Sequence, residues 1–208
     1  MAKVLKDSFQ QLYEIADSQG GFFTAKQAAA VGYSTRMQTY HVQTGDWKRE
    51  WRGIYRLRYY PNLRPDDLMV WYLWSSDRNG KPEGVYSHDT ALELHELSTW
   101  TGSRLHMTVP KDFKRRAVPE ALRLHRADLR HYEITRIGQI AVTTVVRTLL
   151  DLLHSNSVQR HHLIEAMQDG RKRGLIVPSD LVNPCWTAED HDLLKALADD
   201  SRTYVTEA

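Results

Sequence analysis

The chain has 208 residues, of which 41% are hydrophobic and 26% are charged. This composition is sufficient for a buried core, and the length suits a small domain followed by a larger one. No apolar run reaches the roughly 20 residues that cross a membrane, and the amino terminus lacks the long apolar stretch of a signal peptide. We therefore expect a cytoplasmic protein without a membrane partner. The single cysteine, Cys185, excludes an internal disulfide and a cysteine-rich zinc site.

The net charge of +2 is unevenly distributed. Residues 1–65 hold 10 Lys and Arg against 5 Asp and Glu, whereas residues 66–208 hold 18 against 21. A basic amino-terminal part on a mildly acidic remainder indicates a polyanionic partner for the basic part. A basic surface that is merely solvated is the alternative.

The first segment is predicted to be an amphipathic helix. Apolar residues recur at helical spacing over residues 5–16, and Gly20 and Gly21 can end the helix in a left-handed conformation. Thr24 and Gln27 then fit a capping box, in which each side chain accepts a hydrogen bond from the other residue's backbone. A second, short helix is expected from this point.

Two short helices follow one another closely. The first spans residues 25–31 and ends at Gly32, and Ser34 can cap a second helix over residues 35–44. Two helices joined by a glycine-containing turn of about 3–4 residues form a helix-turn-helix. The pattern therefore predicts this DNA-binding motif.

The second of these helices is expected to have two faces. Met37, Tyr40 and Thr44 should pack on the preceding helices. Short polar side chains, amides and an arginine suit base edges in a major groove. We predict that the base-reading residues are Arg36, Gln38, Thr39 and Gln43, with Thr35 helping at the start of the helix. A helix face that is only hydrophilic would look similar.

An aromatic-rich hairpin is predicted next, with strands at residues 47–51 and 54–59 and a turn at Arg52 and Gly53. A hairpin directly after a recognition helix is a wing, whose cations hold phosphates without reading sequence. Trp47, Trp51 and Tyr55 are expected to form the core of this wing. The predicted phosphate contacts are Ser34, Lys48, Arg49, Arg52 and Arg56.

Several segments recur in an order and spacing found in one family. They are Gly20–Thr24, Ala28–Ala29, Gly32–Ser34, Gly45–Trp47, Arg52–Arg56, Tyr86–His95 and Ile137–Leu152. Together they resemble the AbiEi-type antitoxins of type IV toxin–antitoxin systems, and the resemblance spans roughly residues 5–182. No single segment is diagnostic, so the order and spacing carry the comparison.

The resemblance implies a bacterial antitoxin encoded beside a nucleotidyltransferase toxin. Such an antitoxin represses its own operon by binding inverted repeats in the promoter, and it counters the toxin without forming a stable complex. These systems are linked to abortive infection, a form of phage defence. The oligomeric state on DNA stays open.

The remainder of the chain is predicted to be an α+β domain with a small sheet. Helical patterns occur at residues 66–73, 88–97, 144–153 and 161–173, and strand patterns occur at 105–109, 122–125, 134–137 and 140–142. The predicted domains are a winged helix-turn-helix at 1–62, an α+β antitoxin domain at 63–184, and an acidic tail or helix at 185–208.

A basic run follows the first of these strands. Its residues Lys111, Lys114, Arg115 and Arg116 are candidates for secondary DNA contacts. A metal-dependent nuclease is an alternative, but Asp112 and Lys114 lack an acidic partner just upstream. The ten histidines include no HExxH motif and no ligand set at usual zinc spacing. We therefore assign no catalytic residue, metal or cofactor, and we keep a toxin-binding interaction module as a further alternative.

Overall fold

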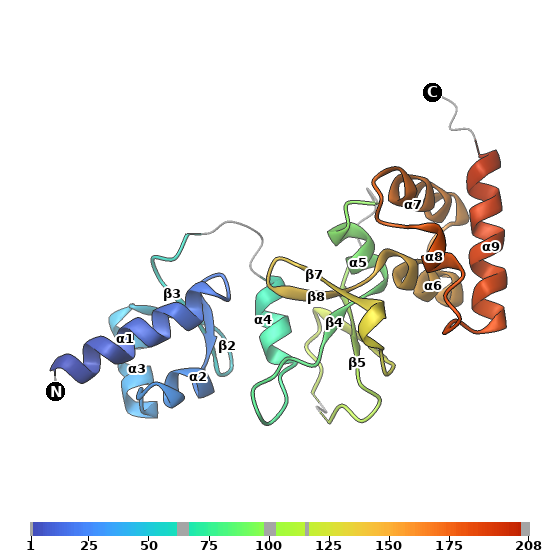
Figure 1. Cartoon of the computed structure of the whole chain (residues 1–208). Helices are drawn as coiled ribbons and strands as arrows, with labels where there is room; N and C mark the ends of the chain where they lie inside the picture. Colours follow the sequence, from blue (N-terminus) through green and yellow to red (C-terminus); the bar gives the residue numbers. More distant parts are fainter. Residues whose placement is uncertain (1, 62–66, 98–102, 115–116, 205–208) are drawn as a thin grey trace. The chain divides into compact units, whose positions relative to one another are not determined.

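The computed structural model describes residues 2–61, 67–97, 103–114 and 117–204 (Figure 1). Over these residues the fold is mixed α+β, with several helices and two small sheets. The chain divides into two compact units. The first comprises Met1–Gly84 with Gly138–Ile140, and the second comprises Val85–Ile137 with Ala141–Ala208. The boundary predicted at residue 62 lies outside the described residues.

In the first unit the described residues form four helices and a three-stranded sheet. The helices are α1 (Ala2–Asp17), α2 (Ala25–Ala30), α3 (Thr35–Thr44) and α4 (Asp67–Trp74), and the strands are β1 (Phe22–Thr24), β2 (Trp47–Trp51) and β3 (Ile54–Leu57). The strand order is β1-β3-β2, with β3 antiparallel to both neighbours. Strand β1, between the first two helices, thus pairs with the hairpin that follows the third.

Local sequence signals set the helix ends in this unit. The predicted capping box is confirmed, because Thr24 Oγ1 accepts from the Gln27 backbone and Gln27 accepts from the Thr24 backbone. Ser34 Oγ accepts from the Met37 backbone at 3.4 Å and caps α3. Gly45 ends α3 with φ +82°, a conformation that glycine adopts without steric cost.

An aromatic core holds this unit together. Phe23 and Trp47 meet edge to face, with ring centroids 4.8 Å apart, and Leu12 and Ala16 of α1 pack against the same cluster. The prediction that Trp47 belongs to the hairpin core is confirmed, and Tyr55 packs against the cluster from β3. Trp51 differs, because it is 41% exposed and contacts Trp71 of α4 instead.

The second unit is built around a five-stranded mixed sheet. Its strands are β4 (Val85–Tyr86), β5 (Leu105–Val109), β6 (Leu122–Arg126), β7 (Ile134–Ile137) and β8 (Ile140–Thr143), in the order β6-β5-β4-β8-β7. Strand β5 is parallel to β6 and antiparallel to β4, which is parallel to β8. The short strand β4, which the sequence pattern did not reveal, therefore occupies the centre of the sheet.

Helices complete the second unit. They are α5 (His88–Leu94), the short 3-10 helix η1 (His131–Glu133), α6 (Val145–Ser155), α7 (Arg160–Lys172), α8 (Pro178–Leu181) and α9 (Ala188–Thr203). Leu149 and Leu152 of α6, Met167 of α7, and Leu194 and Leu197 of α9 are fully buried in one apolar core. The segment from residue 185, for which the sequence left a tail or a helix open, thus contributes a packed helix.

Candidate nucleic-acid interface

The outward face of α3 is a polar stripe. Arg36, Thr39, Tyr40 and Gln43 are all exposed and follow the i, i+3, i+4, i+7 spacing of one helix face. Thr35 is also exposed at the start of the helix. Four of the five predicted base-reading residues therefore lie on one accessible surface.

Gln38 is the exception, and its predicted outward position is wrong. Its side chain is 5% exposed, and Nε2 donates to the backbone oxygens of Ala25 at 3.0 Å and Tyr33 at 2.9 Å. These carbonyls belong to α2 and to the turn that connects it to α3. Gln38 thus joins the two helices and satisfies buried acceptors, rather than facing solvent.

The predicted inward position of Tyr40 is also wrong. It was expected to pack inward, yet 60% of it is exposed. Thr44 was also expected inside, but it is exposed and its hydroxyl donates to Asp46 at 2.7 Å. Met37 does pack against the core of the unit, as predicted. The tyrosine ring is apolar and favours burial, but its hydroxyl can remain in contact with water.

Three of the four basic hairpin residues predicted to contact phosphates are exposed. Arg49 and Arg52 are exposed, whereas Lys48 forms a 3.0 Å ion pair with Glu50 while keeping 68% of its side chain exposed. The Glu50 side chain is only 15% exposed, so a phosphate that draws Lys48 away would leave a largely buried carboxylate without its cation. Ser34, which caps the start of α3, is exposed as well.

Arg56 does not point outward as predicted. It is 7% exposed, its guanidinium carbon lies 5.1 Å from the centroid of the Phe22 ring, and Nη2 donates to the Pro61 oxygen at 3.3 Å. Side chains alternate along a strand, and Arg56 shares the buried face of β3 with Ile54. The structure therefore contradicts its assignment to the phosphate-binding surface.

A carboxylate that the sequence analysis did not consider lies beyond the end of α3. Hydrogen bonds from the Thr44 hydroxyl and from His41 hold the pKa of Asp46 below its usual value. The His41 ring stacks on Trp47 with centroids 4.9 Å apart. Asp46 therefore places a negative charge between α3 and β2.

The predicted secondary DNA contacts belong to the second unit. Lys111 lies 3.9 Å from Asp128 with 72% of its side chain exposed, and Lys114 is exposed as well. Arg115 and Arg116 lie outside the described residues. Arg126 supports the loop, because its Nη1 donates to the Lys111 and Phe113 oxygens at 3.0 Å.

Among the described residues, no helix is long and apolar enough to span a membrane.

Comparison with protein families gives a match within the first unit. Residues 10–58 match a family model of transcriptional regulators. The family is that of the AbiEi antitoxins, which confirms the resemblance over a segment that runs from α1 through β3. No curated protein matches the chain. The match supports a regulatory, antitoxin role, and the resemblance of residues beyond 58 stays a prediction.

Proposed function

We propose that the first unit is a winged helix-turn-helix that binds duplex DNA, and that the protein is an antitoxin that represses its own operon at inverted repeats in the promoter. The observation that carries the proposal is the exposed stripe of Arg36, Thr39, Tyr40 and Gln43. It lies within the segment that matches antitoxin regulators, and a basic hairpin follows it directly.

In this proposal α3 reads bases. A helix is about 10–12 Å across with its side chains, which suits a major groove of about 12 Å. Arg36 can bond bidentately to a guanine, and Gln43 can bond bidentately to an adenine. Tyr40 replaces Gln38 in our assignment, because its ring and hydroxyl lie on the same exposed stripe.

The backbone contacts come from two places. Ser34 and the amide groups at the start of α3 can hold one phosphate, since a helix amino terminus favours an anion. Lys48, Arg49 and Arg52 on the hairpin can hold others, which fixes the register of α3 without reading sequence. Lys111 and Lys114 are a separate proposal for secondary phosphate contacts.

A binding titration tests the proposal. Fluorescence anisotropy with the promoter duplex upstream of the gene should give an affinity at least 10³-fold higher than a scrambled duplex at physiological salt. Arg36→Ala and Gln43→Ala should narrow that ratio, whereas Lys172→Ala on the second unit should leave it unchanged. Equal affinity for both duplexes would contradict the proposal of a sequence-specific repressor.

The antitoxin role is tested separately. We propose that the protein counters a nucleotidyltransferase toxin without a stable complex, which rests on the family resemblance. Co-expression with the toxin encoded next to it should restore growth for the native protein. If repression and neutralisation are independent, Arg36→Ala should relieve promoter repression and still restore growth. Co-purification of the two proteins as a stable complex would favour the interaction-module alternative instead.

A further inference from the structure

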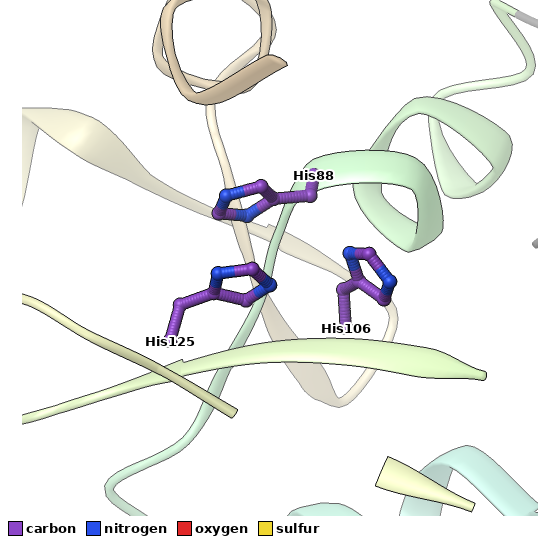
Figure 2. Close-up of side chains that lie close together, drawn as sticks. All are labelled: His88, His106 and His125. Carbon is purple, nitrogen blue, oxygen red and sulfur yellow. The ribbon is translucent and has the colours of Figure 1, made fainter. Parts of the chain in front are cut away.

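Three histidines from separate parts of the second unit meet in its interior. His88 begins α5, His106 lies on β5 and His125 lies on β6, and each offers a ring nitrogen within 4.8 Å of the other two. Figure 2 shows the three rings facing one another above the sheet. The His88 and His125 rings are stacked, with centroids 3.5 Å apart, and the His106 ring lies 5.7 Å and 5.1 Å from them.

Hydrogen bonding within the unit does not account for the cluster. Nδ1 of His106 and Nε2 of His125 are buried without a hydrogen-bond partner among the described residues. His106 Nδ1 lies 3.5 Å from Asp89 Oδ2, but the contact does not form a hydrogen bond. An unsatisfied buried polar atom costs about 1–3 kcal/mol. Two such nitrogens in one cluster therefore indicate an absent partner.

The backbone at His88 has a related peculiarity. His88 has φ +52°, in the left-handed region that residues with a Cβ rarely adopt. Such strain is commonly retained where a side chain must be aimed at a particular point. Here it turns the imidazole toward His125, and Nδ1 makes a 3.0 Å hydrogen bond with the Ser87 hydroxyl. The hydroxyl of Ser87 is in turn held by Thr108 at 2.8 Å.

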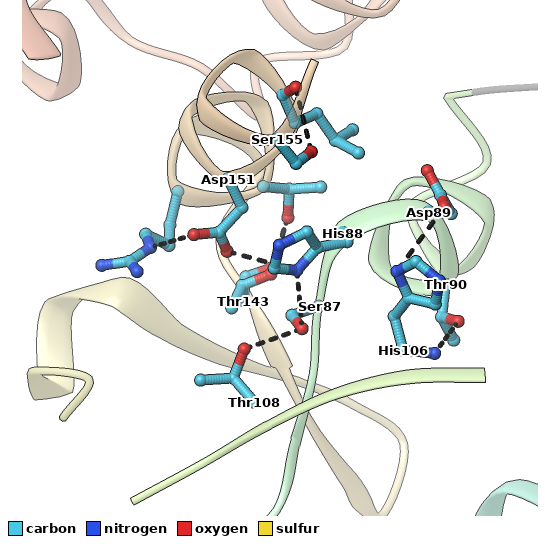
Figure 3. A network of polar contacts seen from close by, with 12 residues as sticks. Ser87, His88, Asp89, Thr90, His106, Thr108, Thr143, Asp151 and Ser155 are labelled. Carbon is cyan, nitrogen blue, oxygen red and sulfur yellow. Dashed lines mark hydrogen bonds and ion pairs between the residues drawn. The ribbon is translucent and has the colours of Figure 1, made fainter. Parts of the chain in front are cut away.

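Buried carboxylates lie beside two of the three rings, those of His88 and His106. Asp89 lies beside His106, and Asp151 Oδ2 lies 3.9 Å from His88 Nδ1 (Figure 3). Arg147 neutralises part of this negative charge, because it pairs with Asp151 and with the buried Glu133. The positive charges of Arg147 and of the exposed Arg123 help to lower the pKa of His88. Carboxylates beside a metal site balance part of the charge of a bound cation, and Asp151 can in addition orient the His88 ring from the side of Nδ1.

We propose that His88, His106 and His125 form a binding site for a divalent transition-metal ion, with zinc as the expected occupant. Imidazole nitrogens suit zinc, copper and nickel, whereas magnesium and calcium prefer oxygen ligands. Three histidines with a fourth position filled by water or a carboxylate form a known class of zinc coordination. The site is independent of the proposed DNA-binding surface.

Binding requires the imidazole rings to reorient. Zinc–nitrogen bonds of about 2.0–2.1 Å in a tetrahedral site place the ligand atoms about 3.3 Å apart. The nitrogens here lie within 4.8 Å, but each nitrogen lone pair lies in its ring plane, so His88 and His125 must turn out of their stacked arrangement for both to bind one ion. His125 is the most exposed of the three side chains. The bound ion would cross-link α5, β5 and β6.

Metal analysis of the full-length protein tests the site. The chelator-stripped protein, dialysed against zinc and then desalted, should retain about one ion per chain by mass spectrometry. His125→Gln should lose that ion, whereas His131→Ala, which removes an exposed histidine outside the cluster, should keep it. Zinc retention by His125→Gln at the native level would overturn the proposal, as would the absence of zinc from the native protein.

Cobalt binding provides a measurement that needs no variant of a buried ligand. Tetrahedral cobalt with nitrogen ligands absorbs strongly in the visible range, whereas hydrated cobalt absorbs weakly. The native stripped protein should develop the strong band with cobalt, and zinc should abolish it. Asp151→Asn should weaken cobalt affinity by about 10–100-fold, with circular dichroism confirming that the variant is folded. The absence of the band in the native protein would refute the site.

Discussion

The two units keep their notable polar side chains in opposite environments. In the first unit Arg36, Thr39 and Gln43 are exposed on one helix. In the second unit His88, His106 and Asp151 are buried, and their environment is almost entirely the protein itself. An exposed set is available for a partner from solvent, whereas a buried set must be satisfied internally or by an ion that enters. The first unit therefore carries the proposed recognition surface and the second an interior site.

The largest expected effect concerns the interior of the second unit. Arg147 is paired with Glu133 and with Asp151, both of which are buried. Burial raises the pKa of Asp151 to about 6, and Arg147 opposes that shift. Arg147→Ala leaves two buried carboxylates without their cation, which should reduce the free energy of unfolding by about 3–5 kcal/mol in urea titrations.

The matched control for that variant is Arg202→Ala. Arg202 pairs with Asp199 on the surface of α9, where the two side chains are 69% and 56% exposed. Its removal should cost at most about 1 kcal/mol. Similar losses for the two variants would show that burial does not distinguish the two ion pairs.

A pair of glutamines tests the comparison within α3. Gln38→Ala removes two hydrogen bonds to buried carbonyls and should destabilise the first unit by about 1–3 kcal/mol. Gln43→Ala removes an exposed side chain, so it should leave stability nearly unchanged and lose about 1–3 kcal/mol of discrimination at one base pair. Thermal unfolding and binding to single-substitution duplexes measure both quantities, and an exchange of the two phenotypes would refute our assignment.

Acidification should weaken the second unit through His95. Burial lowers the pKa of His95, whose Nε2 contacts the Thr143 oxygen at 2.8 Å. The folded state therefore binds fewer protons than the unfolded state, whose histidine pKa is about 6.5, so stability is fully present above that pH and falls below it. One proton corresponds to at most about 1.4 kcal/mol per pH unit. His95→Gln should flatten this dependence in urea titrations between pH 7.5 and 5; an unchanged slope would assign it to other groups.

The smallest effect is expected on the hairpin. Arg52 is exposed and has no sequence-reading role in our proposal, so Arg52→Ala should weaken binding to all duplexes alike. One lost phosphate contact lowers the slope of log affinity against log salt by about 0.9. Arg56→Ala is the informative comparison, because this arginine is buried and should instead reduce stability. A slope unchanged by Arg52→Ala would remove Arg52 from the interface.

The ends of the helices in the first unit were predictable because their causes are local. Thr24 and Gln27 cap α2, and Gly45 ends α3, through contacts that span only a few residues. The faces of α3 were less accessible to sequence reasoning. Gln38 is buried and Tyr40 is exposed, the reverse of the prediction, because Gln38 donates to backbone carbonyls of α2 and of the turn between α2 and α3. The sequence pattern gives no sign of these acceptors.

The histidine cluster was beyond sequence reasoning for a topological reason. On the parallel strands β5 and β6, His106 pairs with Arg123 and His125 pairs with Thr108, so the two histidines lie two positions apart in the register. His88 follows the central strand β4. Ligand motifs are recognised by short, regular spacing, and these residues lie on three elements separated by long connections. The order of the strands, rather than any interval along the chain, brings them together.

The inward position of Gln38 has a consequence for how the proposed specificity could change over evolutionary time. The hydrogen bonds that join α2 to α3 are made from the buried side of the helix. Substitutions at the outward positions Arg36, Tyr40 and Gln43 therefore leave this joint intact, and exposed positions tolerate replacement at little cost in stability. A repressor and its operator can then diverge together, one base pair at a time, on an unchanged scaffold.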